Sequence, residues 1–245
     1  MIGIVLVSHS PQLADAALAL AREMVPGDEP RVGVAAGATG GGTGTDATRV
    51  ASAIADVASR DGVLVLMDLG SAVLSAELAI ELAGDVGGEV RLSPAPVVEG
   101  LLAAVVRAAG GASLDEADRE ARGALAAKES QLGTAAPGEP AAGSPAPVDG
   151  ADGAADGALA EEFVVGSPVG LHARPASLLV GALTGLDAKV TVASGDKKPV
   201  DGRSPIGLMA LGVQQGERIR VTATGPDAQV AMDAIRALAA RDFGD

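Results

Sequence analysis

The sequence predicts two globular domains: an α/β domain with a mainly parallel, doubly wound sheet, followed by a smaller α+β domain. Strand and helix patterns alternate along residues 1–133, which is typical of a parallel sheet with helices on both faces. Residues 160–245 instead favour an antiparallel sheet with helices on one face. Between them, residues 134–159 are almost entirely Ala, Pro, Gly and Asp. Such a segment cannot bury enough apolar surface to offset its ordering entropy, so we expect a flexible linker.

Apolar runs and helical spacing give the elements of the first domain. The run 2–7 is apolar throughout, as expected for a parallel strand buried on both faces. Ser10 and Pro11 then suit the cap and first position of a helix. The remaining expected strands are 31–35, 63–67 and 89–92, and the remaining expected helices are 46–60, 70–82, 98–109 and 114–132.

The second domain shows shorter elements. Strands are expected at 162–165, 189–193, 200–201 and 217–223, and helices after Pro175, at 204–211 and at 227–240. Ser204 suits the cap of the middle helix, and Pro205 suits its first position.

Composition excludes several classes of protein. The net charge of −14 divides into −9 for residues 1–133, −4 for 134–159 and −1 for 160–245, so no segment is a basic footprint for nucleic acid. Cysteine is absent, which excludes disulfides and thiolate sites. Residues 2–7 lack the basic flank and length of a signal peptide, and no apolar run reaches membrane-spanning length. We therefore expect a soluble cytoplasmic protein that uses no membrane partner.

The chain has two histidines, and the first follows the first predicted strand. Ligands of open α/β sheets bind outside the carboxyl ends of the strands, where His9 and Asp68 both lie. A carboxylate on one imidazole nitrogen would fix the tautomer and leave the other nitrogen as a nucleophile. His9 as a solvated loop residue and Asp68 as a helix cap are the simpler alternatives.

Backbone N–H groups near these two residues predict an anion site. They come from the glycine-rich loop that ends at Gly44 and Thr45, and from the helix that begins at Gly70 and Ser71. The loop lacks the lysine of a nucleotide P-loop and does not fit a dinucleotide fingerprint, so it could also be a plain turn.

The second histidine, His172, precedes a helix with Pro175 in its first turn, where a missing N–H costs nothing. Free N–H groups of that turn and the Arg174 guanidinium could stabilise a phosphoryl group on the imidazole. Both residues could equally be ordinary exposed residues at a helix start. A metal site is not favoured, because the two histidines lie in separate domains without further ligands nearby. A Ser-His-Asp hydrolase is not favoured either, because no nucleophile-elbow sequence is present.

Two segments of the second domain carry a resemblance to a known family: residues 166–176 read GSPVGLHARPA, and residues 201–212 read DGRSPIGLMALG. They closely resemble the two signatures of HPr, the histidine phosphocarrier protein, over about residues 160–245. The resemblance implies an open-faced α+β sandwich in which Enzyme I phosphorylates His172 on Nδ1 and Arg174 supports the phosphoryl group. Ser204 matches the regulatory phosphoserine of many HPr proteins, but Pro205 after it departs from the pattern that the HPr kinase recognises.

Four segments of the first domain, 4–10, 44–47, 67–72 and 95–100, read IVLVSHS, GTDA, MDLGSA and APVVEG. They resemble the mannose-type IIA domain and, more narrowly, the phosphotransferase subunit of the dihydroxyacetone kinase that uses phosphoenolpyruvate instead of ATP. This resemblance implies that His9 accepts phosphate on Nε2, that Asp68 orients it, and that the domain forms a homodimer.

Together the resemblances imply a phosphoryl relay from phosphoenolpyruvate and Enzyme I to His172, then His9, then ADP on the nucleotide-binding subunit of the kinase. The partners would be Enzyme I and the nucleotide-binding and dihydroxyacetone-binding subunits, with no cofactor on this chain. Because the sequence stops after the HPr-like segment, Enzyme I is expected to be a separate protein. Two alternatives stay open: a component of a sugar-transport phosphotransferase system, and a regulatory module switched by phosphorylation.

Overall fold

The computed structural model of the chain describes residues 1–25, 28–132, 158–168 and 170–243, which form two compact units, Met1–Ala124 and Leu125–Asp245. The expected linker, residues 134–159, lies outside the described residues except for its last two. No helix within the described ranges is long and apolar enough to cross a membrane.

The first unit is a four-stranded parallel sheet with the strand order β2-β1-β3-β4. Its strands are β1 (Gly3–Ser8), β2 (Val32–Ala36), β3 (Val63–Met67) and β4 (Val90–Ser93). Its helices are α1 (Pro11–Glu23), α2 (Ala47–Val57), α3 (Gly70–Ala83), α4 (Val97–Ala109) and α5 (Leu114–Arg122). The doubly wound α/β fold that the sequence predicts is thus confirmed.

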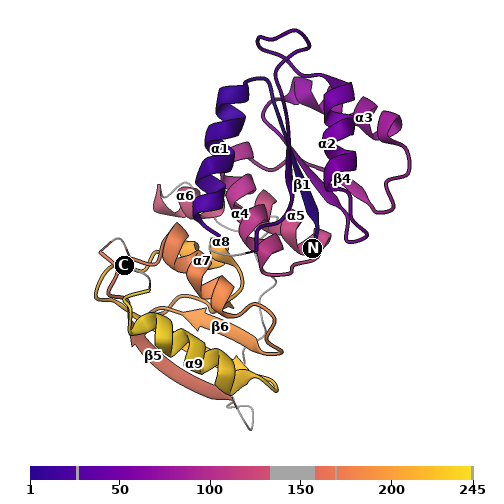
Figure 1. The fold of residues 1–245 in the computed structure, drawn as a ribbon. Helices are drawn as coiled ribbons and strands as arrows, with labels where there is room; N and C mark the ends of the chain where they lie inside the picture. The colour runs from indigo at the N-terminus through magenta and orange to yellow at the C-terminus, as the bar shows by residue number, and fades with distance from the viewer. Residues whose placement is uncertain (26–27, 133–157, 169, 244–245) are drawn as a thin grey trace. The chain divides into compact units, whose positions relative to one another are not determined.

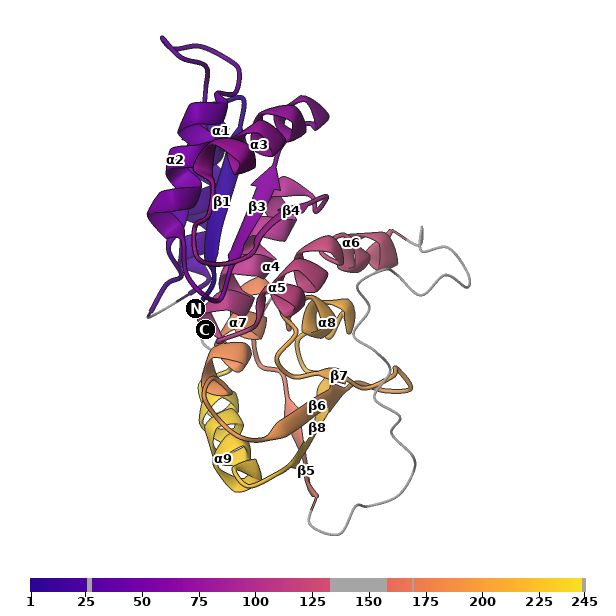
Figure 2. The same ribbon diagram turned by 90° about the vertical axis from the view of Figure 1, so that its right-hand side faces the viewer.

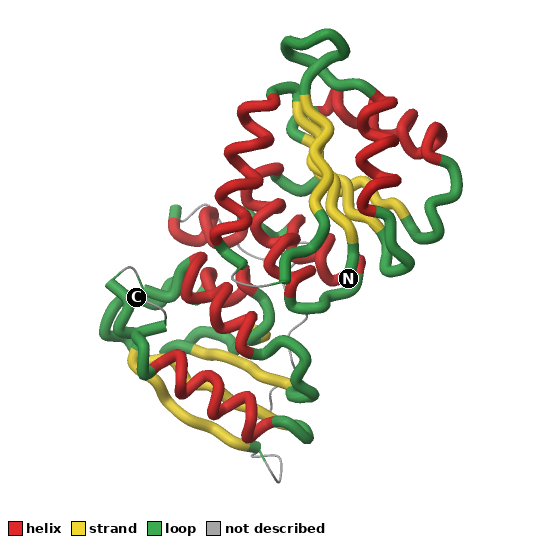
Figure 3. The backbone as a smooth tube through the Cα atoms, in the orientation of Figure 1, coloured by secondary structure: helices red, strands yellow, loops and turns green. Residues whose placement is uncertain are grey.

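Helices cover both faces of this sheet. Alternate strand residues point to opposite faces, so β1 contributes Ile4 and Leu6 to a core with α1, α4 and α5, and Val5 and Val7 to a second core with α2 and α3. Figure 1 shows α1 and α4 on one side of the strands and α2 and α3 on the other, and Figure 3 shows the same layers. This burial on both faces explains the unbroken apolar run of β1.

Side chains cap two helices of the first unit. Ser10 accepts from the Leu13 N–H at the start of α1, as its sequence predicts, and Asp46 accepts from two N–H groups at the start of α2. Each cap satisfies backbone donors that have no partner inside the helix, and so fixes where the helix begins after its strand.

The single helix expected over residues 114–132 is wrong. The structure ends α5 at Arg122 and starts a separate helix, α6 (Ala126–Gln131), which groups with the second unit and contacts α8. The break falls at Gly123, the C-cap of α5. Glycine costs about 1 kcal/mol in a helix interior, which favours the break there.

The second unit contains a four-stranded antiparallel sheet with the order β5-β8-β6-β7, labelled in Figure 2. The strands are β5 (Leu159–Val164), β6 (Lys189–Ala193), β7 (Val200–Asp201) and β8 (Arg218–Thr224). The further helices are α7 (Ala173–Ala182), α8 (Pro205–Ala210) and α9 (Ala228–Ala239). α9 packs on β5, β8 and β6, and α7 contacts both α8 and α9. The predicted α+β class is therefore confirmed.

Candidate phosphoryl-transfer sites

The parallel pairing of β1 and β3 brings His9 and Asp68 together. Val7 is the register partner of Met67, and the Asp68 N–H donates to the Val7 carbonyl over 3.1 Å. His9 and Asp68 therefore leave the sheet at its carboxyl edge from adjacent strands, where ligands of open α/β sheets bind.

The Asp68 carboxylate holds His9 through both of its oxygens. Its Oδ1 lies 2.9 Å from the His9 Nδ1, and its Oδ2 accepts from the His9 backbone N–H over 2.8 Å. The Oδ2 also accepts from the Ser8 hydroxyl over 2.9 Å. The imidazole is 18% exposed and the carboxylate only 6%, so the carboxylate is covered while the ring edge stays accessible.

These contacts decide which nitrogen of His9 is free. Burial by itself would raise the pKa of Asp68, but the hydrogen bonds from the His9 ring, the His9 amide and the Ser8 hydroxyl lower it below its ordinary value. The ionised carboxylate only accepts, so the neutral ring carries its proton on Nδ1. The Nε2 keeps its lone pair and lies 2.9 Å from the Ser71 hydroxyl, which donates to it.

Ser8 is a site residue that sequence reasoning did not assign to this role. It ends β1, is buried, and its Oγ accepts from the Ser10 N–H over 3.1 Å while donating to Asp68. The available signal was a serine at the end of an otherwise apolar strand, which must find a polar partner when buried.

The glycine-rich loop after β2 donates hydrogen bonds to the backbone carbonyls just before and just after the His9 side chain. The Gly37 N–H donates to the Ser8 carbonyl and the Gly44 N–H to the His9 carbonyl, each over 3.0 Å. The Thr45 hydroxyl is 2.7 Å from the Ser75 hydroxyl of α3. The structure thus gives Gly44 and Thr45 partners within the protein, whereas Gly70 and Ser71 form the exposed first turn of α3 beside the imidazole.

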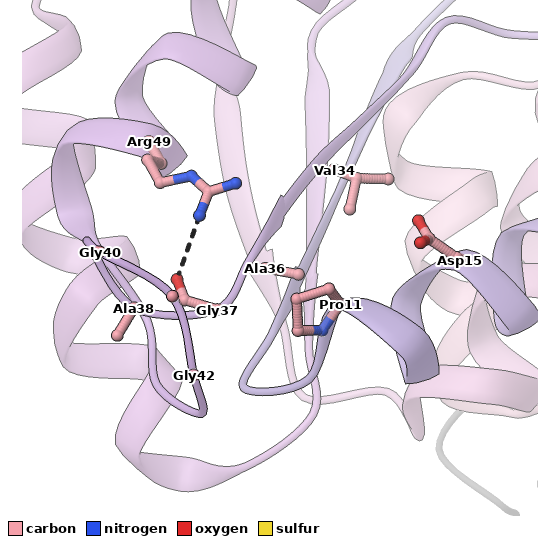
Figure 4. A pocket seen from close by; sticks show the side chains of 10 residues that line it. Pro11, Asp15, Val34, Ala36, Gly37, Ala38, Gly40, Gly42 and Arg49 are labelled. Atoms are coloured by element: carbon pink, nitrogen blue, oxygen red, sulfur yellow. Dashed lines mark hydrogen bonds between the residues drawn. The ribbon is translucent and has the colours of Figure 1, made fainter.

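A cavity of about 400 Å³ lies beside this loop (Figure 4). Its lining includes Pro11, Asp15 and Arg49, and the Arg49 guanidinium donates to the Gly37 carbonyl over 3.5 Å. His9, Asp68 and Ser71 are not among its lining residues, so the reactive nitrogen is reached from outside this cavity.

In the second unit, His172 is the N-cap of α7, and its side chain is exposed. Its carbonyl accepts from the Ala176 N–H over 2.9 Å, which starts the helix, while its imidazole makes no capping bond. Arg174, in the first turn, is exposed and has no hydrogen-bond or ion-pair partner among the described residues. An anion on the imidazole would meet both the positive end of α7 and this guanidinium.

The backbone before His172 depends on a glycine. Gly170 has φ +74°, and a Cβ there would lie 2.1 Å from the carbonyl oxygen of Val213. The same carbonyl accepts from the Leu171 N–H over 2.9 Å. This close approach fixes the loop that presents His172.

Ser204 is buried at the N-terminus of α8, where its hydroxyl accepts from the Gly207 N–H over 2.8 Å. This contact is the helix cap that the sequence predicts. Within the described ranges, no cluster of three or more His, Cys, Asp or Glu side chains is arranged to hold a metal ion.

Comparison with known proteins gives the class of each unit. Residues 3–118 match the family described as the PTS system fructose IIA component, and residues 159–241 match the family described as the PTS HPr component phosphorylation site. Each unit is thus similar to a phosphotransferase-system domain, the first to a IIA component and the second to HPr.

The relatives that align with the whole of this chain carry more specific descriptions. The chain is 42% identical over 249 residues to the "PEP-dependent dihydroxyacetone kinase, phosphoryl donor subunit DhaM" of Klebsiella michiganensis, and 43% identical to that of Pantoea ananatis. Each alignment covers 100% of this chain and 51% of the relative, so the chain spans about half the length of the curated relatives it matches. The crystal structure of HPr-C-His from Thermoanaerobacter tengcongensis is 33% identical, over 36% of this chain and 97% of that one, with a TM-score of 0.34.

Proposed function

We propose that this chain relays phosphoryl groups in a phosphoenolpyruvate-dependent dihydroxyacetone kinase. Enzyme I would phosphorylate His172, which would pass the group to His9. His9 would pass it to ADP on the nucleotide-binding subunit, which would then phosphorylate dihydroxyacetone held by the dihydroxyacetone-binding subunit. The similarity to DhaM subunits along the whole chain supports this acceptor over a sugar permease.

The observation that carries the proposal is the pair of contacts on the His9 ring. Asp68 occupies Nδ1 and the Ser71 hydroxyl contacts Nε2, so Nε2 is the nitrogen with a lone pair directed outward. A neutral imidazole held in one tautomer is a nucleophile at cellular pH.

The transfer step follows from this geometry. The Nε2 lone pair attacks phosphorus, the new N–P bond forms as the N–P bond at His172 breaks, and that electron pair returns to Nδ1 of His172. Ser71 turns its hydroxyl from Nε2 to a phosphoryl oxygen, and Asp68 stabilises the positive charge that develops on the ring. Return of the group to ADP reverses these roles, so one pocket serves both transfers.

The domain arrangement is part of the proposal. Residues 1–133 would act as the IIA-type domain and residues 160–245 as the HPr domain. A flexible segment 134–159 of about 25 residues would have a root-mean-square span of about 25–30 Å. Such a tether would hold the domains at an effective concentration in the millimolar range. We further propose that the first domain forms a homodimer and that the protein works in the cytoplasm, where its phosphoryl donors would be found.

The test is acid-labile phosphate on the wild type, His9→Ala and His172→Ala after incubation with Enzyme I and phosphoenolpyruvate. The relay requires that His172→Ala takes up nothing and that His9→Ala is labelled only on His172. Labelling of His9 in His172→Ala would remove the HPr domain as the entry point. Adding the two kinase subunits with dihydroxyacetone then tests the acceptor, because a transport component would form no dihydroxyacetone phosphate.

A further inference from the structure

The turn that follows α9 holds an unusual backbone conformation. Asp242 and Phe243 have φ values of +49° and +59°, and within the described ranges they are the only residues other than glycine with a positive φ. This left-handed region is uncommon for such residues, and a bulky side chain rarely adopts it. A strained conformation of this kind persists only where the surrounding structure holds it, and it is often found at functional sites.

Phe243 is the anchor of this turn. Its side chain is fully buried, at 0% exposed, although the two residues before it, Arg241 and Asp242, are exposed. Its N–H donates to the Leu238 carbonyl of α9 over 2.9 Å, which closes the turn. The chain contains only two phenylalanines and no tryptophan or tyrosine, so Phe243 is one of its largest apolar groups. Burial of this side chain therefore fixes where the turn lies on the domain.

The anchored turn places Asp242 against Gly166. A Cβ on Gly166 would lie 2.1 Å from Oδ1, 2.7 Å from Cγ and 3.1 Å from Cβ of Asp242. Gly166 is not among the glycines with a positive φ, so this contact, and not the backbone conformation, excludes a larger residue there. The Gly166 carbonyl accepts from the Gln215 side chain over 3.0 Å. Side chains from two other parts of the domain thus fix the position of Gly166.

Gly166 opens the loop that leads to His172, six residues later. The next residue, Ser167, is fully buried, and its carbonyl accepts from the Gly170 N–H over 2.9 Å. Its hydroxyl has no hydrogen-bond partner among the described residues, so no polar contact of its side chain holds Ser167 in place. A displacement of Gly166 would therefore reach Gly170, two residues before His172, through a single hydrogen bond.

We propose that Asp242 and Phe243 are positioning residues for His172. Their turn packs on Gly166 and so keeps the loop in the arrangement that presents the imidazole. Neither residue touches the phosphoryl group, since both act through Gly166. This inference rests on the proposed relay and adds to it a requirement on the reacting geometry, because a displacement of about 1 Å can cost about 10²-fold in rate.

The test uses the full chain with His9→Ala, which leaves His172 as its only histidine. Enzyme I and phosphoenolpyruvate phosphorylate this protein, and the initial rate at increasing protein concentration gives kcat and KM. The ¹⁵N NMR signals of the single imidazole report the surroundings of His172 without any enzyme. Circular dichroism melts report the stability of each variant.

One set of variants tests the contact between Gly166 and Asp242. Gly166→Ala should shift the imidazole signals and lower kcat at least about tenfold, with little change in KM, because its Cβ would overlap the Asp242 side chain. Asp242→Gly adopts a positive φ without strain and should lower kcat only about threefold. The double variant should match Asp242→Gly alone, since the obstacle is gone. A double variant that stays as slow as Gly166→Ala contradicts the proposed contact.

A second set tests the anchor. Phe243→Ala should lower kcat at least about tenfold and shift the imidazole signals, and Phe243→Leu, which refills much of the space, should restore most of the rate. The control is Val190→Ala, a buried change on β6 beside Ala223, near the end of β8. The loop to His172 starts at the other end of this strand, where the Val165 N–H donates to the Glu217 carbonyl. Val190→Ala should lower the melting temperature and leave kcat and the imidazole signals unchanged.

Every result counts for or against the positioning role. If Val190→Ala loses as much rate as Phe243→Ala, the loss reflects stability alone and the role is refuted. If Phe243→Ala does not fold, the Gly166 and Asp242 variants decide, because Asp242 is exposed. If Enzyme I phosphorylates no protein, not even the one with His9→Ala alone, the relay fails, and the imidazole signals still test the positioning. Unchanged signals in all the variants overturn it.

Discussion

Replacing Asp68 with asparagine tests whether the carboxylate fixes the nucleophilic nitrogen of His9. The substitution keeps the size of the side chain and the acceptor that serves the His9 amide and the Ser8 hydroxyl. It replaces the oxygen that lies 2.9 Å from Nδ1 with an amide nitrogen, which donates. The amide would select the tautomer with its proton on Nε2, so the lone pair would point at Asn instead of at phosphorus.

The substitution should lower both the rate of transfer and the stability of the first domain. A histidine held in the wrong tautomer by an Asp→Asn change loses about 10⁴ in rate in the serine-protease triad, and we expect a loss of about 10²–10⁴ here because Asp68 is similarly buried. One hydrogen bond to a charged group is worth about 1.5–3 kcal/mol, so the free energy of unfolding of the first domain should fall by about that amount.

The pH dependence of the unfolding free energy tests the role of the Asp68 carboxylate independently. Because folding lowers the pKa of Asp68, the stability that the carboxylate provides is fully present above its unfolded pKa of about 4, and it is lost as the pH falls through the folded pKa. The difference in unfolding free energy between wild type and Asp68→Asn should therefore be constant above about pH 5 and shrink below pH 4. Denaturant unfolding at a series of pH values measures it.

The assay for the rate is single-turnover transfer to His9, and ¹⁵N NMR of the imidazole reports the tautomer directly. A variant that transfers within threefold of wild type and keeps its proton on Nδ1 would refute the assignment of Asp68. A slow variant with the wild-type tautomer would mean that Asp68 acts on charge and not on the position of the proton.

The remaining predictions concern three other positions. Ser8→Ala removes one of two donors to the same carboxylate oxygen and should slow transfer to His9 about tenfold, with a shifted imidazole ¹⁵N signal; an unchanged signal would make Ser8 purely structural. Arg174→Ala should slow phosphorylation of His172 by Enzyme I about tenfold or more at unchanged melting temperature, and equal rates would exclude it from the site. Gly170→Ala places a Cβ 2.1 Å from a carbonyl oxygen at φ +74° and should destabilise the second domain by about 2 kcal/mol or more, whereas Gly181→Ala in α7, with open space around it, serves as the control. Equal melts for the two glycine variants would contradict the close approach.

The sequence predicts most of the fold because its local signals agree with one another. Four apolar runs separated by helices allow few arrangements other than a doubly wound sheet. Such a sheet places the residues after β1 and β3 at one edge, so the approach of His9 to Asp68 follows from strand order and register. The helix expected over 114–132 is wrong because periodicity does not reveal that the chain breaks at Gly123. Nor does it reveal that α6 packs on α8 of the second unit.

What the sequence alone determined is therefore the class of each domain, its capped helices and the two histidines at strand-to-helix junctions. Only the tertiary structure decided that Ser8 and Ser71 complete the His9 site, since both contacts join residues about 60 positions apart. It also decided which face of α3 is buried: Ala72, Ala76 and Ala79 lie in the core, whereas Leu74, Leu78 and Leu82 are exposed. Hydrophobicity alone would favour burial of the larger leucines, so this choice depends on how α3 packs against α2 and the strands, which local sequence patterns do not contain.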